Sequence, residues 1–311
     1  MPNIRIYIAY HKASVLVESP CLFPIHVGKR LSELPIGIPG DDEGASISHK
    51  NRTFCELTAI YWAWMNDQTS DYIGLMHYRR FLDFSGATGR RLSPWGTIDV
   101  SDIDDNFIPE FGLTCESLER VVSSYDIALP RPWDVRSQGF SSLYDEYAAA
   151  ADHFARDLDG VEYVIRDLFP EYTASYIKVV KQGSAGYFTN VFLMRRDIFH
   201  NYCQWLFGVL FELEKRLDIS TYTPAAQRVF GYIAERLCAV YVDRLKALDP
   251  KVRIGLVDRV WVANTSVDQS PAGIPSRTRT RRVLWWFWQP LPLRIKKCLL
   301  PMRHYLKQRL L

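Results

Sequence analysis

The chain has 311 residues, of which 48% are hydrophobic and 23% charged, as is typical of a folded protein with one large α/β domain or two small ones. It contains no apolar run of about 18 residues and no signal-peptide pattern at its start, so we expect neither a transmembrane helix nor a secretory leader. The net charge of +3 is unevenly distributed along the chain. Residues 277–311 contain ten Lys and Arg and no Asp or Glu, so residues 1–276 have a net charge of −7.

The first predicted element is a strand over residues 4–10, which alternate and are rich in β-forming side chains. Its end would lie at the edge where an open α/β sheet binds ligands. A loop rich in Pro, Gly and Asp follows over residues 35–44, and apolar residues at helical spacing predict a helix over 49–66. The residues expected at the strand's end are Ala9, Tyr10, His11 and Lys12.

A short apolar strand is predicted over residues 71–76 and is followed at once by four polar residues. Residues 85–112 look irregular, which is long for a loop in a compact domain and typical of a functional loop. Another strand is predicted over 125–129. The four polar residues are His77, Tyr78, Arg79 and Arg80.

The second half of the chain continues the alternation of strands and helices, which predicts an α/β fold with a mixed sheet flanked by helices. A boundary is expected near Asp268, because Pro and Gly residues follow it and lead into the basic tail. The domain would then span residues 1–268 and the tail 269–311. The predicted elements are helices over 141–168, 198–217 and 225–245, a buried strand over 187–195, and a strand over 252–262 that closes the sheet.

The cysteines form no CxxC pair, and no histidine stands at zinc-like spacing from them. Several lie in apolar runs. We therefore expect buried free thiols in a reducing compartment rather than a disulfide framework. The six residues are Cys21, Cys55, Cys115, Cys203, Cys238 and Cys298.

The two arginines after the 71–76 strand are the first candidate site. A guanidinium donates two parallel hydrogen bonds to phosphate oxygens, which suits a diphosphate ligand. If the strand continued, Arg79 and Arg80 would point to opposite faces, and one of them would be structural. The alternative is a solvated basic pair without a ligand.

Adjacent aspartates in a glycine-flanked loop form the second candidate site. Asp41 and Asp42 could hold a divalent metal, manganese or magnesium, or act as a base. The alternative is a turn that uses the local hydrogen bonding of aspartate. The following helix start, which includes Asn51, could bind an anion through its free amides.

Three further polar residues interrupt apolar elements. Arg228 and Glu235 are two helical turns apart on one face, and a glutamate in a cleft can serve as a general base. The alternative for Glu235 is an ion pair with Arg236. Asn190 lies in an apolar run, where a buried amide needs a partner, either a sugar hydroxyl or the backbone.

The basic tail interleaves arginines with tryptophans and leucines. Tryptophan prefers the headgroup layer of a membrane and Lys and Arg attract anionic lipids, so we expect an interfacial segment rather than a spanning one. The alternative is a segment that binds a protein partner or nucleic acid.

Five segments of the sequence carry a resemblance to a known family. They are IYIAYHK at 6–12, GDDEGASISHKNRTFCELTAIYWAW at 40–64, DYIGLMHYRRFLDF at 71–84, NVFLMRRDIFHNYCQWLFGVLFELEKRLD at 190–218 and QRVFGYIAERL at 227–237. Together they resemble the domain-of-unknown-function 4422 family, which occurs in capsule and O-antigen gene clusters and is regarded as a family of glycosyltransferases. The resemblance spans residues 4–262.

The resemblance implies a GT-A-like nucleotide-sugar-binding fold and a UDP-linked donor of a hexosyl group, galactosyl or galactofuranosyl. It implies a surface-polysaccharide or lipid-linked glycan acceptor, no nucleic acid, and a cytoplasmic enzyme at the inner face of the plasma membrane. Many GT-A enzymes hold a metal with Asp-x-Asp after a middle strand, whereas this sequence has His-Tyr-Arg-Arg, so cationic side chains could neutralise the diphosphate instead. The alternatives are a non-catalytic carbohydrate-binding or assembly protein and a sugar phosphotransferase, although no phosphate loop is present.

The roles expected for the residues follow from these segments. Catalytic roles are expected for Asp41, Asp42 or Glu235. Acceptor binding is expected for Asn190 and Arg228. Donor binding is expected for Ala9, Tyr10, His11, Lys12, Asn51, His77, Tyr78, Arg79 and Arg80.

Deletion of residues 277–311 is expected to abolish binding to anionic liposomes, because it removes ten basic side chains worth roughly 1 kcal/mol each near such a surface. Activity on a short soluble acceptor should persist. Co-sedimentation with vesicles of anionic and of zwitterionic lipid measures the effect. Equal sedimentation of the full and shortened chains with anionic vesicles would show that the tail does not bind membranes.

Overall fold

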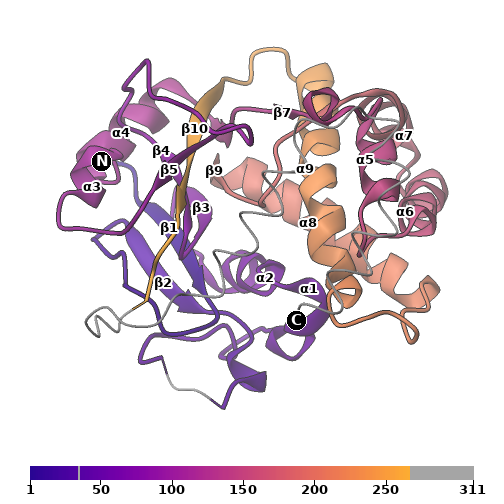
Figure 1. The fold of residues 1–311 in the computed structure, drawn as a ribbon, viewed down its shortest axis with the longest axis horizontal. Helices are drawn as coiled ribbons and strands as arrows, with labels where there is room; N and C mark the ends of the chain where they lie inside the picture. Colours follow the sequence, from indigo (N-terminus) through magenta and orange to yellow (C-terminus); the bar gives the residue numbers. More distant parts are fainter. Residues whose placement is uncertain (34–35, 267–311) are drawn as a thin grey trace, which may run out of the picture. The chain divides into compact units, whose positions relative to one another are not determined.

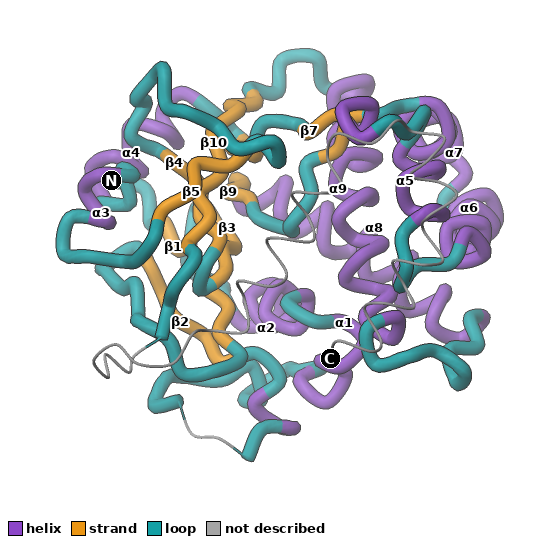
Figure 2. Tube along the Cα trace, in the orientation of Figure 1, coloured by secondary structure: helices purple, strands orange, loops and turns teal. Residues whose placement is uncertain are grey.

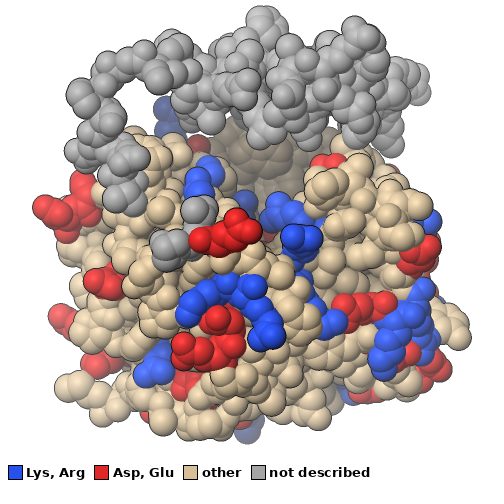
Figure 3. All heavy atoms as spheres, turned by 90° about the horizontal axis from the view of Figure 1, so that it is seen from below, with Lys and Arg blue, Asp and Glu red and all other residues tan. Residues whose placement is uncertain are grey.

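The computed structural model describes residues 1–33 and 36–266. The predicted tail, with Cys298, lies outside these residues. Strands and helices alternate along the described chain, which confirms the mixed α/β fold (Figure 1). On the face shown in Figure 3, basic and acidic side chains lie among one another rather than in separate patches.

A mixed sheet of eight strands forms the centre of the described chain (Figure 2). A second sheet contains only β7 (Trp133–Asp134) and β8 (Ala185–Gly186). The strands of the main sheet are β1 (Ile4–Tyr10), β2 (Leu22–His26), β3 (Tyr72–His77), β4 (Arg80–Asp83), β5 (Thr97–Val100), β6 (Ile127–Pro130), β9 (Phe192–Arg195) and β10 (Ile254–Val262).

The pairing of the strands explains their directions. β1 lies parallel to both β2 and β3, whereas β9 is antiparallel to β3 and to β6. The long strand β10 pairs first with β6 and then with β4 and β5. Since β3 also meets β4 at the pair His77 and Arg80, the strands β3, β9, β6, β10 and β4 are paired in a closed circuit.

Helices cover both faces of the sheet (Figure 1). The α-helices are α1 (Asn51–Phe54), α2 (Leu57–Asn66), α3 (Phe107–Glu110), α4 (Cys115–Ser124), α5 (Leu143–Ala149), α6 (Ala155–Leu168), α7 (Thr173–Tyr176), α8 (Arg196–Arg216) and α9 (Val229–Leu248). The shorter turns are η1 (Lys29–Leu31), η2 (Ser48–Lys50), η3 (Val135–Gln138), η4 (Pro170–Tyr172), the π-helical η5 (Ile177–Gln182) and η6 (Ala226–Arg228). No helix within residues 1–33 and 36–266 has the length and apolar character needed to cross a bilayer.

Alternating side chains of the strands feed two apolar cores, one on each face of the sheet. In β1, Tyr7 and Ala9 join the core formed with α2, α6, α8 and α9, while Ile6 and Ile8 join the core formed with α3 and α4. Both layers are needed because the central strands are buried on both faces.

The helix predicted over 49–66 is wrong as a continuous element. It breaks after α1 at Cys55, which has a left-handed φ of 52°, and resumes at Leu57. The side-chain amide of Asn51 donates to the Cys55 carbonyl at 2.7 Å. A Cβ at Gly231 of α9 would lie 3.2 Å from Cys55 Sγ, so the break also depends on a glycine in a distant helix.

The strand predicted over 187–195 is wrong in its first half, since β9 begins only at Phe192. Phe188, Thr189 and Asn190 have φ values of 41°, 68° and 50°. Such left-handed conformations cost of order 1–3 kcal/mol each for non-glycine residues and persist only where surrounding contacts enforce them. The hydrogen bonds that enforce this turn belong to the candidate site described below.

Smaller differences concern three other segments. The helix predicted over 141–168 forms as α5 and α6 with a break between them. The region 85–112 contains β5 and α3, and the following α4 was not predicted. The other predicted strands and helices form with shifts of a few residues.

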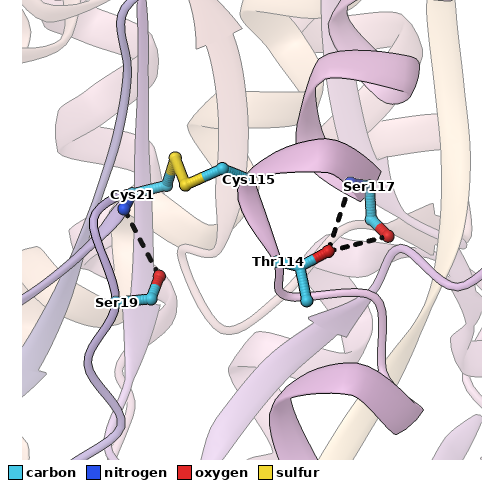
Figure 4. The surroundings of a disulfide bond; sticks show 5 residues. All are labelled: Ser19, Cys21, Thr114, Cys115 and Ser117. Atoms are coloured by element: carbon cyan, nitrogen blue, oxygen red, sulfur yellow. Dashed lines mark hydrogen bonds between the residues drawn. A yellow bond between two sulfur atoms is a disulfide. The ribbon is translucent and has the colours of Figure 1, made fainter.

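The prediction that every cysteine is a free thiol is wrong for Cys21 and Cys115, which form a disulfide (Figure 4). They are 94 residues apart, and the fold brings their Cα atoms to 5.7 Å by placing the start of α4 beside the chain before β2. Thr114 caps α4 by accepting from the Ser117 amide at 3.3 Å. Cys203 and Cys238 are buried free thiols as expected, and Cys55 is free and half-buried.

Asp126 joins the ends of three strands through charge-assisted hydrogen bonds. Its carboxylate accepts from Arg253 Nη2 at 2.8 Å and from Arg195 Nη1 at 2.7 Å. The hydrogen bonds from Arg253, together with the charge of Arg195, lower the pKa of the buried Asp126 to about 2. A depressed carboxyl pKa stabilises the folded state above the unfolded pKa of about 3.9, and this contribution is lost as the pH falls towards 2.

The variant Asp126→Asn is therefore expected to lower the free energy of unfolding by about 1–2 kcal/mol at pH 7, allowing for the partial exposure of both arginines. The difference from the wild type should narrow between pH 5 and pH 3. Urea unfolding at pH 7, 5 and 3 measures it. The matched control is Asp197→Asn, which removes a 59% exposed partner of Arg195 and should cost less than about 1 kcal/mol. A difference that stays constant with pH would contradict the assignment.

Candidate active site

The carboxyl ends of the parallel strands β1 and β3 bring two predicted segments together. Ala9 lies beside His77 in the strand register, and the Tyr78 amide donates to the Ala9 carbonyl at 3.1 Å. The ring of His11 meets the ring of Tyr78 edge-on at 5.0 Å between centroids. Residues 9–12 and 77–80 therefore form one edge of the sheet, as parallel pairing leads one to expect.

Arg79 lies in the turn between β3 and β4 and Arg80 is the first residue of β4, so the two side chains do not diverge as they would in a continuous strand. Both guanidinium groups approach the ring of Trp261, at 3.9 Å and 5.3 Å from its centroid. Trp261 belongs to β10 and pairs with Arg80 in the sheet. The aromatic ring holds the two cations on one side of the edge.

Two further cations stand near this edge. The ammonium of Lys12 lies 5.5 Å from the ring centroid of Tyr78, and Arg228 Nε donates to Cys55 Sγ at 3.3 Å. Within the described residues, none of Lys12, Arg79, Arg80 and Arg228 forms an ion pair with a carboxylate. We call these four residues the cationic corner. Its positive charge is available for an anionic ligand.

Glu56, in the break between α1 and α2, supplies a carboxylate beside these cations. Its Oε1 accepts from Asn190 Nδ2 at 2.7 Å, and the same amide nitrogen donates to the Gly231 carbonyl at 3.1 Å. Burial opposes ionisation of Glu56, but the hydrogen bond from the Asn190 amide and the charge of Arg80 favour the ionised form, and the pKa of Glu56 lies below the usual value. Glu56 is therefore an ionised carboxylate at neutral pH.

Glu56 is not among the site residues predicted from the sequence. A signal was present, because Glu56 is the only charged residue between Arg52 and Asp67 in an otherwise apolar and aromatic helical pattern. A charge at such a position needs a partner or a function.

Glu235 lies in α9 and is held from two sides. Its Oε1 accepts from the Thr189 amide at 2.9 Å, and its Oε2 pairs with Arg236 Nη1 at 3.0 Å, which confirms the ion pair considered as an alternative. Arg236 also binds Glu146 at 2.6 Å. Burial raises the pKa of Glu235, and Arg236 only partly opposes this. The pKa values of Glu56 and Glu235 are thus shifted in opposite directions.

His77 is buried and serves as a neutral donor. Burial lowers the pKa of His77 to about 4. Its Nδ1 lies 3.4 Å from Arg80 Nη1, and since arginine can only donate, Nδ1 is the acceptor and Nε2 carries the hydrogen. Desolvation by the surrounding chain, followed by repulsion from Lys12 and Arg228, also lowers the pKa of His11.

Several buried polar atoms at this place have no hydrogen-bond partner in residues 1–33 and 36–266. Buried polar groups in proteins are nearly always paired, so their clustering indicates a polar ligand. The atoms are His77 Nε2, Arg79 Nε, Thr189 Oγ1 and Asn190 Oδ1.

The predicted residues Asp41, Asp42 and Asn51 hold loops. The fully buried Asp41 accepts from the amides of Gly28 at 2.9 Å and Lys29 at 3.2 Å and from the Ser48 hydroxyl. Asp42 pairs with Lys29 at 3.3 Å, and Asn51 supports the Cys55 carbonyl. Catalysis by Asp41 or Asp42 stays a prediction that these contacts do not support.

The sequence also raised the possibility of a divalent metal site at Asp41 and Asp42. No group of three or more His, Cys, Asp and Glu side chains among the described residues is arranged to hold a metal ion. The manganese or magnesium ion considered from the sequence has no such ligand set there.

Similarity to known proteins extends over most of the chain. A family model described as a domain of unknown function (DUF4422) matches residues 5–246, and no curated protein matches. A solved apo structure of the bifunctional glycosyltransferase WbbM has a TM-score of 0.82 and 38% sequence identity. The match covers 88% of this chain and 48% of that one, so the chain spans about half the length of this relative. The match over residues 5–246 shows that the chain belongs to the DUF4422 family.

Proposed function

We propose that the chain is a glycosyltransferase that moves a hexosyl group from a UDP-linked sugar to the glycan of a surface polysaccharide or lipid-linked acceptor. The observation that carries this proposal is the cationic corner: four positive side chains, without a carboxylate partner in residues 1–33 and 36–266, stand beside the ionised Glu56 at the carboxyl edge of the sheet. The identity to WbbM supports the reaction class. Because the chain spans about half of that bifunctional protein, we assign it one transfer reaction.

The cationic corner would bind the donor diphosphate. As the bond between the sugar C1 and the phosphate oxygen breaks, its electron pair stays on the departing nucleoside diphosphate. Arg79 and Arg80, with Lys12 and Arg228, stabilise this developing negative charge, which is the part a metal ion has in many such enzymes. The Nε2–H of His77 is a further donor that needs no charge of its own.

Glu56 would act as the general base. An acceptor hydroxyl gives its proton to the Glu56 carboxylate while its oxygen forms the new bond to the sugar C1. Direct attack of this kind inverts the configuration at C1. Glu235 holds the left-handed turn at Thr189 and does not react. The unpaired Asn190 Oδ1 can accept a hydrogen bond from a hydroxyl of the acceptor glycan. The tail would keep the enzyme at the cytoplasmic face of the plasma membrane.

Arg79→Ala is expected to lower kcat roughly 100-fold or more, because it removes one preorganised group that stabilises charge in the transition state. Turnover of a panel of UDP-sugars, measured as UDP release with and without acceptor, checks this. The control is Arg166→Ala on α6, whose partner Glu162 lies four residues earlier on the helix surface. A loss under threefold would remove Arg79 from the site, and a wild type that neither binds UDP nor transfers sugar would favour a non-catalytic protein.

Glu56→Gln is expected to lower kcat roughly 100-fold or more while it keeps the hydrogen bond from Asn190. In the wild type, kcat/KM should stay constant from pH 8 to pH 5 and fall only below about pH 4.5, because the lowered pKa of Glu56 keeps the base ionised. Glu214→Gln, which alters a pair with Lys50, is the matched control. Melting temperatures at each pH separate inactivation from unfolding. An acid limb near pH 6.5 would assign the base to another group.

A further inference from the structure

Three aromatic rings form a row next to the two glutamates. Trp95 and Trp133 lie 5.3 Å apart between ring centroids, and Trp133 and Phe188 lie 5.5 Å apart. The rings come from the loop before β5, from β7, and from the turn before β9. We call them the aromatic row.

Several contacts fix the aromatic row. β7 pairs with β8 so that Trp133 lies opposite Gly186, and a Cβ at Gly186 would come within 3.1 Å of the Phe188 ring. The glycine therefore lets Phe188 pack against the strand. Trp133 Nε1 donates to the Pro94 carbonyl at 3.3 Å. These contacts anchor the row in the folded domain, although Trp95 lies in the irregular segment before β5.

The aromatic row is continuous with the candidate active site. Phe188 is followed directly by Thr189, whose amide binds Glu235, and then by Asn190, whose amide binds Glu56. The guanidinium of Arg236, the partner of Glu235, lies 4.9 Å from the Phe188 ring centroid. The Phe188 end of the row is therefore connected through Asn190 to the proposed base.

The surface of the row suits a sugar. Trp95 is 42% exposed, and Trp133 and Phe188 are half-buried. Polar groups lie beside the row: the Arg236 guanidinium is 4.9 Å from the Phe188 ring centroid, and Arg259 Nη2 donates to the Trp95 carbonyl at 2.8 Å. A sugar ring has an apolar face of C–H groups and a rim of hydroxyls, and it fits an aromatic ring bordered by hydrogen-bonding groups.

The cations of the corner contact groups other than the three rings of the row. Arg79 and Arg80 face Trp261, Lys12 faces Tyr78, and Arg228 contacts Cys55. The donor diphosphate thus has its own side chains, which leaves the row for the second substrate.

We infer that Trp95, Trp133 and Phe188 bind the acceptor glycan and present its hydroxyl to Glu56. This inference rests on the proposed glycosyltransferase function and adds the acceptor subsite to it. The acceptor is then an oligosaccharide with at least one sugar ring stacked on the row, rather than a protein side chain or a free lipid phosphate. The long loop that carries Trp95 contributes directly to the choice of acceptor.

Binding of the full chain to a glycan microarray, with UDP present, tests the inference. We expect the wild type to bind a defined set of oligosaccharides, and Trp95→Ala and Trp133→Ala to weaken this binding about tenfold or more. Trp95→Phe should retain most of it, because a ring remains. The control is Tyr163→Ala, which removes a 62% exposed aromatic ring from α6. Trp95→Ala alters a surface side chain, so it keeps the test decisive if Trp133→Ala does not fold.

The stabilisation of each variant by UDP-sugars is measured in parallel by thermal shift, since a donor that binds the folded state raises its melting temperature. Unchanged donor stabilisation with weakened glycan binding supports the inference. Equal glycan binding in all variants, or no glycan bound by the wild type, overturns it and leaves the donor site standing. If UDP-sugars neither stabilise the wild type nor are transferred, but glycan binding still depends on the row, the proposed function is overturned and glycan binding by the aromatic row is not.

Discussion

The hydrogen bonds of one buried amide, that of Asn190, hold the candidate site together. Its nitrogen donates to Glu56 in the break between α1 and α2 and to the Gly231 carbonyl in the first turns of α9. Three segments that are far apart in the sequence meet at this side chain. The left-handed conformations of Cys55 and of residues 188–190 are unfavourable locally, and these tertiary contacts, with the bond from Thr189 to Glu235, keep them in place.

The same contacts determine the charges at the site. The Asn190 amide and the nearby cations favour the ionised form of Glu56. Burial disfavours the ionised form of Glu235, and the ion pair with Arg236 only partly opposes this effect. The cations of the corner are held by aromatic rings and a thiol rather than by carboxylates. Aromatic and sulfur contacts position a cation without neutralising it, so its charge remains available to a ligand.

The fold separates two kinds of surface around one carboxylate. The ends of β1 and β3 provide the cationic corner, and the segments around β7 and β8 provide the aromatic row. Both lie within residues 5–246, which match the DUF4422 family model. Such an arrangement suits a reaction with one highly charged and one neutral substrate, because each is recognised by the interaction that its own chemistry favours.

The sequence by itself determined the α/β class, five of the strands and the longer helices, and it assigned residues 9–12 and 77–80 to one donor, because buried strands have a strong local pattern and parallel strands end at the same edge. It did not determine the break at Cys55, the turn at Thr189, or the pairing of Cys21 with Cys115. Only the tertiary structure decided these, since each depends on a residue 40 or more positions away, and local propensity contains no information about such contacts. Glu56 became part of the site for the same reason: the break that contains it packs closely against Gly231 of α9, where a Cβ would lie 3.2 Å from Cys55 Sγ.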